Sequence, residues 1–251
     1  TEYRPDPFCD FAAVDSSHQH NCCWAWRSLG LVKGDNGLCS GYAWVVDDIN
    51  QANDWADFWW TLNTSPENTI ALKGERATIQ GWRHGNAMDV HFALPAVGRY
   101  PKPHTLALTQ DMAVSSSHKY GDVDAAVKRF IRPSDMLHGP VFRRPRLIAK
   151  ISGYNGRIMA LMIPRGKGMA APVVERISSL DNSFALQVTF PRVRDTLVYA
   201  YEHHLLEADD VKGVGTWCVV RRDRRTGRVL RAAMGDGTSL SVAGRPVRYQ
   251  A

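Results

Sequence analysis

Residues 88–94, Met-Asp-Val-His-Phe-Ala-Leu, place apolar side chains at every second position, as a half-buried β-strand requires. One face of such a strand would carry four large apolar side chains, Met88, Val90, Phe92 and Leu94. The opposite face would carry Asp89 and His91. We therefore expect a strand with one face in the core, and we expect His91 on the side of solvent or of a cleft.

Similar runs with a period of two recur every ten to fifteen residues along most of the chain. They cover residues 42–46, 57–62, 69–73, 76–80, 105–108, 147–151, 157–163, 173–177, 184–190 and 197–201. The last fifty residues read as a meander with strands at 216–221, 228–233, 239–242 and 247–249. Because so few helices intervene, a doubly wound parallel sheet is excluded. We predict an all-β protein, a large antiparallel β-sandwich of two packed multi-stranded sheets with one short helix.

The length of 251 residues lies within the range that a single β-sandwich domain reaches. We expect one domain over residues 1–251, in which residues 1–23 form a Cys-rich N-terminal arm. Between residues 104 and 146 the alternation fades and Pro, Ser, His and Arg accumulate, so an irregular excursion is predicted there. The one helix is expected between Asp122, which can cap it, and Pro133.

Charge and cysteine content bear on partners and on compartment. The 31 Lys and Arg residues exceed the 25 Asp and Glu residues by six, and the pI of about 9.2 favours anionic partners. Apolar runs are far shorter than the roughly 18 residues of a membrane-spanning helix, so we expect a soluble chain with no membrane partner. Four of the five cysteines lie within the first 39 residues, which leaves a local disulfide and free thiols both open. A disulfide would fit a secreted or periplasmic protein from which any export signal has been removed.

Residues 42–50, Tyr-Ala-Trp-Val-Val-Asp-Asp-Ile-Asn, contain an acidic pair near the end of a strand pattern, and residues 57–64, Asp-Phe-Trp-Trp-Thr-Leu-Asn-Thr, end in Asn-Thr. This order resembles the C-terminal sheet domain of heparinase II/III-like polysaccharide lyases. The resemblance continues through residues 147–152, 157–166 and 237–247. It implies a β-sandwich from an enzyme that cleaves an acidic, uronate-containing glycan by β-elimination. In that family a helical toroid precedes the β-sandwich domains, so a helical toroid domain or chain is an expected partner.

The loop at residues 82–86, Trp-Arg-His-Gly-Asn, combines a guanidinium, an imidazole and an amide. Elimination from a uronate needs a cation or amide to neutralise the C5 carboxylate and a base to remove the adjacent proton. We take Arg83 and His84 as catalytic candidates and Asn86 as a substrate-binding candidate, with a solvated loop as the alternative. His91 and Tyr154 are further catalytic candidates, although the Tyr-Asn-Gly sequence at residues 154–156 also predicts a hairpin turn.

The His-Gln-His sequence at residues 18–20 is similar to a stretch of the same family in which one histidine faces substrate and another can hold a metal. On a strand, His18 and His20 would project from one face and could together bind a divalent ion. A polar loop near the terminus is the alternative. The elimination chemistry itself requires no cofactor, so a divalent metal is an optional addition.

Two basic runs could bind an anionic polymer, residues 143–146, Arg-Arg-Pro-Arg, and residues 221–225, Arg-Arg-Asp-Arg-Arg. We take Arg143, Arg144 and Arg146 as substrate-binding candidates, whereas a solvated hairpin turn is the simpler interpretation of the second run. Nucleic acid is the competing partner, but no recognisable reading helix, RNP-type strand or zinc finger accompanies these runs. Three hypotheses follow: a lyase acting on an anionic polysaccharide, a non-catalytic carbohydrate-binding or structural domain, and, third, a basic nucleic-acid-binding β-protein.

Overall fold

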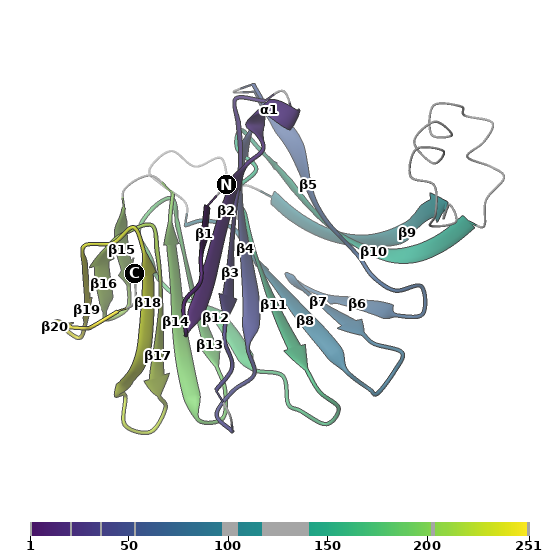
Figure 1. Ribbon diagram of the computed structural model, residues 1–251. Helices are drawn as coiled ribbons and strands as arrows, with labels where there is room; N and C mark the ends of the chain where they lie inside the picture. The colour runs from purple at the N-terminus through teal and green to yellow at the C-terminus, as the bar shows by residue number, and fades with distance from the viewer. Residues whose placement is uncertain are drawn as a thin grey trace.

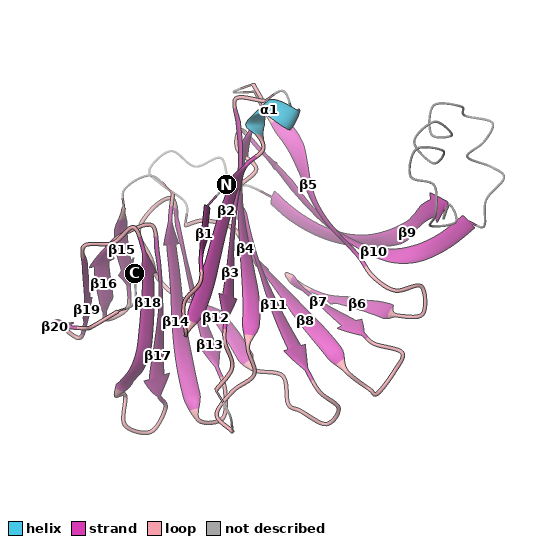
Figure 2. Ribbon diagram, in the orientation of Figure 1, coloured by secondary structure: helices cyan, strands magenta, loops and turns pink. Residues whose placement is uncertain are grey.

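The computed structural model describes residues 2–20, 22–35, 37–52, 54–96, 105–116, 141–201 and 204–249. Nearly all regular structure in these ranges is β-strand, as Figures 1 and 2 show. Every strand pairing among them is antiparallel. One helical turn, α1 (Ser17–His20), stands between the strands of the described ranges. None of the described residues form a helix with the length and apolar content needed to span a membrane.

An eight-stranded sheet forms the body of the protein, with the strand order β1-β2-β3-β4-β11-β8-β7-β6. In that order the strands are β1 (Glu2–Arg4), β2 (Cys9–Asp15), β3 (Trp24–Val32), β4 (Tyr42–Asn50), β11 (Ile158–Arg165), β8 (Ala87–Ala93), β7 (Arg76–Gln80) and β6 (Thr69–Lys73). The late strand β11 pairs with both β4 and β8 and is covered on both faces. Its sequence is accordingly a continuous apolar run, Ile-Met-Ala-Leu-Met-Ile, without alternation.

A five-stranded sheet packs against one face of this body and completes the sandwich. Its strands are β12 (Val173–Arg176), β13 (Ser183–Thr189), β14 (Val193–Ala200), β17 (Trp217–Asp223) and β18 (Val229–Gly235). The rings of Trp44 and Trp217 meet across the interface with centroids 5.6 Å apart, and Phe11 stacks on Trp217 at 5.1 Å. Gly30 makes room for this cluster, because a Cβ atom there would lie 2.1 Å from the Trp44 indole.

Two smaller sheets cover the remaining apolar faces. The strands β5 (Ala56–Asn63), β10 (Val141–Gly153) and β9 (Thr105–Ser116) form a three-stranded sheet over β7, β8 and β11. The strands β15 (Leu205–Ala208), β16 (Val211–Val214), β19 (Ser239–Val242) and β20 (Arg245–Pro246) form a four-stranded sheet against the five-stranded one. Each pair of sheets encloses an apolar core, so the molecule has three cores in its described part.

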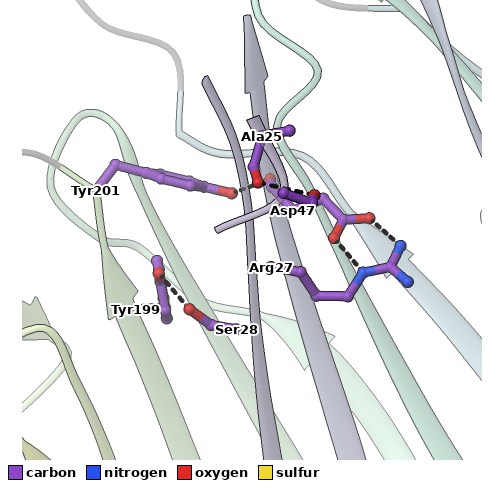
Figure 3. A network of polar contacts seen from close by, with 7 residues as sticks. Ala25, Arg27, Ser28, Asp47, Tyr199 and Tyr201 are labelled. Atoms are coloured by element: carbon purple, nitrogen blue, oxygen red, sulfur yellow. Dashed lines mark hydrogen bonds and ion pairs between the residues drawn. The ribbon is translucent and has the colours of Figure 1, made fainter. Parts of the chain in front are cut away.

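A network of polar contacts joins the two large sheets, from the middle of β3 and from β4 to the end of β14 (Figure 3). The hydroxyl of Tyr201 donates to the backbone oxygen of Asp47 at 2.9 Å, and the Tyr199 hydroxyl hydrogen-bonds to that of Ser28 at 3.0 Å. The Asp47 carboxylate accepts two bonds from Arg27, at 2.6 and 2.8 Å. These contacts satisfy polar groups that would otherwise be buried without partners at the interface.

The all-β prediction is confirmed, and the described strands form four sheets instead of the two expected. The prediction of a separate N-terminal arm is wrong, because β1 and β2 are paired strands of the eight-stranded sheet. The prediction of an irregular segment at residues 104–146 is wrong for residues 105–116 and 141–146, which belong to the long strands β9 and β10. The helix expected between Asp122 and Pro133 lies outside the described residues. All five cysteines are free thiols.

The Tyr-Asn-Gly sequence at residues 154–156 does not close a hairpin. It connects β10 of the three-stranded sheet to β11 of the eight-stranded sheet, and these two strands are not paired. A glycine is needed there for a different reason, because a Cβ atom on Gly156 would lie 2.4 Å from the side chain of Phe58. Close packing of two sheets, rather than reversal of the chain, explains the glycine at this position.

Candidate functional site

A pocket of about 610 Å³ lies among three connections between strands. They are residues 34–35 and 37–41 between β3 and β4, residues 166–172 after β11, and residues 190–192 between β13 and β14. These connections are at the lower end of the sandwich in Figure 1. Its lining mixes apolar and charged side chains, among them Leu38, Met169, Phe190, Asp35, Arg165 and Arg192. An apolar pocket with a few charged groups is the usual form of a small-molecule site.

Arg165, the last residue of β11, is held rigidly at the wall of this pocket. Its Nε donates to Asp89 Oδ2 at 2.6 Å, and its Nη1 reaches the backbone oxygen of Met169 at 3.4 Å. Asp89 also accepts a bond from Thr78 at 2.8 Å. Burial by itself would raise the pKa of Asp89, but the bonds from Arg165 and Thr78 keep that pKa below its ordinary value. The charge of Arg165 is therefore largely balanced by a buried carboxylate.

Lys167 and Arg192 differ from Arg165 in that no carboxylate balances their charge within the described ranges. Both side chains are exposed. Arg224 brings a second basic turn beside them, because its Nη1 donates to the backbone oxygens of residues 190 and 191 at 3.5 and 3.4 Å. The Asp223 carboxylate in that turn accepts bonds from two backbone N–H groups of the same turn, at 2.7 and 3.0 Å.

Cationic residues gather in and beside the turns at this end of the sandwich. We call the surface they form the basic end, and its members are Arg83, Arg165, Lys167, Arg192, Arg224, Arg225 and Arg228. Their accumulation around a pocket raises the local positive potential and attracts anionic groups. Solution salt screens such exposed charges over about 10 Å, so attraction at this surface depends on ionic strength.

The β7–β8 loop, which carries three sequence-predicted site residues, also belongs to this end of the molecule. His84 and Gly85 have positive φ values of 60° and 64°, as in the tight two-residue turns of hairpins. Arg83 lies over the Trp82 ring at 4.0 Å. A Cβ atom on Gly85 would lie 3.1 Å from Cγ of Lys167, so the loop touches the pocket-lining segment after β11. Arg83 and His84 are thus exposed beside the pocket, and its lining does not include them.

Asn86 lines a second, smaller hollow of about 250 Å³ between the three-stranded sheet and the body. Asn63 and Asn68 lie in the same hollow. The Asn68 side chain donates to the Thr64 hydroxyl at 2.5 Å and accepts from the backbone N–H of Trp82 at 3.2 Å. The predicted binding residue Asn86 is therefore grouped with other amides, which hydrogen-bond to neutral hydroxyl groups as readily as to anions.

His91 is half-buried on β8, between Arg76 of β7 and Leu161 of β11 in the strand register. Burial lowers its pKa, the charge of Asp89 opposes this, and Arg76 adds to the lowering. The side-chain face predicted from the alternation is confirmed, since His91 and Asp89 share the face opposite Val90 and its core. Because His91 is half-buried and shares its face with the buried Asp89, it is less accessible to a large ligand than the exposed residues of the β7–β8 loop.

We expect the stability of the fold to depend on the protonation of His91. Because the folded-state pKa is lower than the unfolded value of about 6.5, the unfolded chain binds the proton first as the pH falls. The free energy of unfolding should therefore decrease below about pH 6.5 in the wild type, and should decrease less in His91→Gln. Urea titrations between pH 5 and 8 measure this difference, and equal pH slopes for the two proteins would contradict it.

Tyr154 does not join the other catalytic candidates. It precedes β11 at the Ile158 end, whereas Ala87 and the β7–β8 loop lie beside Arg165 at the other end of that strand. Eight residues of extended strand separate the two ends by roughly 25 Å. Arg83, His84 and Tyr154 therefore do not form one catalytic group on this chain.

The three arginines predicted to bind substrate lie on β10. Arg146 is paired with Asp111 of β9, with Nε 2.8 Å from Oδ1, so its charge is balanced within the strand pair. Arg144 is exposed on the same strand. Arg143 is part of β10, and its side chain lies outside the described residues. The strand thus offers one exposed arginine, Arg144, among the described side chains.

The strand geometry expected for the two histidines is wrong, because Ser17–His20 form the helical turn α1. The shared strand face on which a two-histidine site depended is therefore not formed. Among the described residues, no group of three or more His, Cys, Asp and Glu side chains is arranged to hold a metal ion.

Sequence reasoning missed the residues that line the pocket. Arg165 and Lys167 lie in a Pro-Arg-Gly-Lys-Gly sequence at 164–168, where alternating glycines and cations after a buried strand could have marked an anion-binding loop. Arg192 follows a proline in a tight turn and carries no comparable signal. Its place beside Arg165 depends on the packing of two sheets, which local patterns do not report.

The basic run at residues 221–225 also differs from its simplest interpretation. The hairpin between β17 and β18 is confirmed. Arg221 and Arg222, however, are buried and paired with Asp195 and Asp210, so only the residues of the turn itself are solvated. Buried arginines require such partners, because a charge without one is strongly destabilising in the interior.

No family model matches the sequence, and no curated protein sequence matches it. The solved structures that are similar in fold include heparan sulfate lyase HepC from Pedobacter heparinus and a mutant of that enzyme. Each superposes with a TM-score of 0.50 at 11% identity, over 74% and 75% of this chain respectively. The aligned region is 25% of the lyase chain in both cases, so this protein spans about a quarter of that enzyme. At this identity the likeness shows that the two share a β-sandwich-like fold.

Proposed function

We propose that this chain is the β-sandwich part of a polysaccharide lyase and that it binds an acidic, uronate-containing glycan at its basic end. The observation that carries the proposal is the pocket of about 610 Å³ with Arg165 and Arg192 in its lining and Lys167 beside it. The fold shared with part of a heparan sulfate lyase supports a glycosaminoglycan as the glycan class. Carboxylates and sulfates of such a chain are the anions that arginine binds with paired hydrogen bonds.

The elimination step is assigned to the β7–β8 loop. Arg83 would neutralise the C5 carboxylate of the uronate, which makes the C5 proton more acidic. A nitrogen of the His84 imidazole would take that proton as the C4–O4 bond breaks, and the released O4 would take a proton from water or from a second group. Both residues are exposed beside the pocket. A glycan bound at the basic end would therefore pass close to them.

A non-catalytic carbohydrate-binding domain is the second candidate function. The separation of Tyr154 from Arg83 and His84 favours it, because among the described residues the proposed phenol acid does not lie beside the proposed base. A helical toroid domain or chain remains the proposed partner that would supply the missing group. The two candidates share the basic end and differ in whether a double bond forms in the product.

We expect the double variant Lys167→Ala/Arg192→Ala to bind heparan sulfate about tenfold more weakly than the wild type at low salt. Each exposed ionic contact contributes up to about 1 kcal/mol, so two contacts together can supply the roughly 1.4 kcal/mol that corresponds to a factor of ten. Titration calorimetry in a series of salt concentrations measures this loss. The affinity of the wild type should fall more steeply with salt than that of the variant.

The matched control is Lys73→Ala/Arg76→Ala, which removes the same charge from the β6–β7 turn at the far end of these strands. It should bind heparan sulfate almost as the wild type does. An equal loss in both variants would mean that the overall charge, and not the basic end, attracts the glycan.

A further inference from the structure

A second surface, on the outer side of the three-stranded sheet, carries aromatic side chains that the basic end does not use. Trp59 and Trp60 are adjacent in β5 and point to opposite faces, as alternation in a strand requires. Trp60 is in the core, where its ring meets Phe92 at 5.2 Å. Trp59 points outward and is 61% exposed, although burial of so large a ring is strongly favourable.

Two further rings extend this surface along the strand. Trp55 directly precedes β5 and Tyr154 directly follows β10, and they are side by side because Ala56 pairs with Gly153. Their rings meet edge to face, with centroids 5.5 Å apart and an interplanar angle of 87°. Both remain about half exposed, at 45% and 48%. Four residues of strand place Trp55 roughly 13 Å from Trp59, farther than the width of one pyranose ring.

Polar groups fill the space between the rings. The Asp57 carboxylate accepts a bond from the Ser152 hydroxyl at 2.6 Å and pairs with Lys150 Nζ at 2.7 Å. This ion pair is itself exposed and has no net charge. We call the surface formed by Trp55, Asp57, Trp59, Lys150, Ser152 and Tyr154 the aromatic face. It offers flat apolar rings separated by hydrogen-bonding groups, without the positive charge of the basic end.

We propose that the aromatic face binds a chain of pyranose residues, with one sugar stacked on Trp59 and another near Trp55 and Tyr154. A pyranose ring has an apolar face of C–H groups and a rim of hydroxyls, which complements an exposed indole flanked by hydrogen-bonding side chains. Stacking of a sugar ring on an indole does not require the sugar to carry a charge. The proposal stands independently of the basic end, because it uses other strands and another type of contact.

The aromatic face predicts binding that survives high salt. At 1 M NaCl the screening length is about 3 Å, so exposed ionic contacts contribute little while ring stacking persists. We expect Trp59→Ala to bind heparan sulfate in 1 M NaCl about tenfold more weakly than the wild type, and Trp59→Phe to recover part of the loss. In ¹⁵N-tryptophan-labelled protein, the indole N–H signal of Trp59 should shift when heparan sulfate is added.

Two controls separate this proposal from the basic end. Trp26→Ala removes a ring of similar exposure, 52%, on β3 of another sheet and should leave the high-salt affinity unchanged. Lys167→Ala/Arg192→Ala should weaken binding at low salt only. The proposal is overturned if the wild type does not bind in 1 M NaCl or if Trp59→Ala binds as the wild type does. It is also overturned if sedimentation shows a wild-type dimer that Trp59→Ala dissociates, since the face would then join two copies.

Discussion

Replacing Arg221 with alanine should lower the free energy of unfolding by about 3–5 kcal/mol, the usual cost of removing one partner from a buried ion pair. The side chains of Arg221 and Asp195 are both 0% exposed, and they share two hydrogen bonds, at 2.9 and 2.7 Å. Arg221 Nη1 also donates to the backbone oxygen of Lys33 at 3.0 Å, and the Tyr42 hydroxyl donates to Asp195 at 3.1 Å. The variant would leave a buried carboxylate with only the tyrosine as partner.

The neighbouring arginine is a matched control for this prediction. Arg222 makes an equally short pair of bonds to Asp210, at 2.6 and 2.7 Å, but the Asp210 side chain is 34% exposed and can be hydrated once the arginine is gone. Arg222→Ala should therefore destabilise the protein less than Arg221→Ala. Urea denaturation measures both, and a loss below about 1 kcal/mol for Arg221→Ala would contradict the role assigned to the buried pair.

The contacts of Arg221 that stabilise the fold also support the pocket at the basic end. Lys33 begins the connection between β3 and β4, and the following residues line the pocket at the basic end. Because Arg221 holds the backbone of Lys33 to the five-stranded sheet, it also holds one wall of the pocket in place. The double variant Arg221→Met/Asp195→Leu should recover much of the stability, since apolar pairs can replace a buried ion pair.

Replacing Arg83 and His84 with alanine should reduce any eliminase activity of this chain by about a hundredfold to a thousandfold. That is the usual effect of removing a group that stabilises charge in the transition state. Formation of the unsaturated uronate, followed by its near-ultraviolet absorbance, measures the rate. We expect kcat to fall with little change in KM, because the lost contacts act mainly in the transition state.

The stability of this variant should change little, since both side chains are exposed and surface substitutions usually stay within about 0.5 kcal/mol. His84 has a positive φ, so His84→Asn combined with Arg83→Ala controls for backbone strain, as Asn tolerates this conformation better than Ala. A wild-type rate in either variant would place the chemistry elsewhere. A wild-type chain that binds heparan sulfate without forming product would favour the non-catalytic candidate.

Local patterns predicted most strands between residues 42 and 200 and the position of side chains on them in part. They did not predict β1, β2, β3, β15 and β16, and the strand expected at residues 247–249 is not formed. The alternation at residues 88–94 correctly separated Val90 in the core from His91 on the other face. The adjacent tryptophans of β5 show the limit of this reasoning. Alternation requires Trp59 and Trp60 to point to opposite faces, but it does not say which face is covered, because that depends on a sheet that packs from elsewhere in the chain.

From the sequence alone, candidate site residues can be grouped only where they are neighbours in the chain. Arg83, His84 and Asn86 share one loop, and the structure places that loop at the basic end. Arg165 lies in a glycine-rich basic sequence, but its partner Asp89 is 76 residues away and its neighbour in the pocket, Arg192, comes from another sheet, so no local pattern brings these side chains together. Tyr154 was grouped with the loop by its chemistry alone, and the length of β11 separates them.

An all-β chain follows from the amino-acid pattern, because a side-chain period of two is a local property of each strand. The excess of positive charge follows from the composition. Where that charge acts depends on how the sheets pack against one another. Within one basic run Arg221 is buried against Asp195 while Arg225 is exposed in a turn, and Arg165 and Arg192 from different sheets line one pocket. The physical reason is that burial, pairing and pocket shape depend on contacts between segments far apart in the chain, whereas alternation depends only on neighbours.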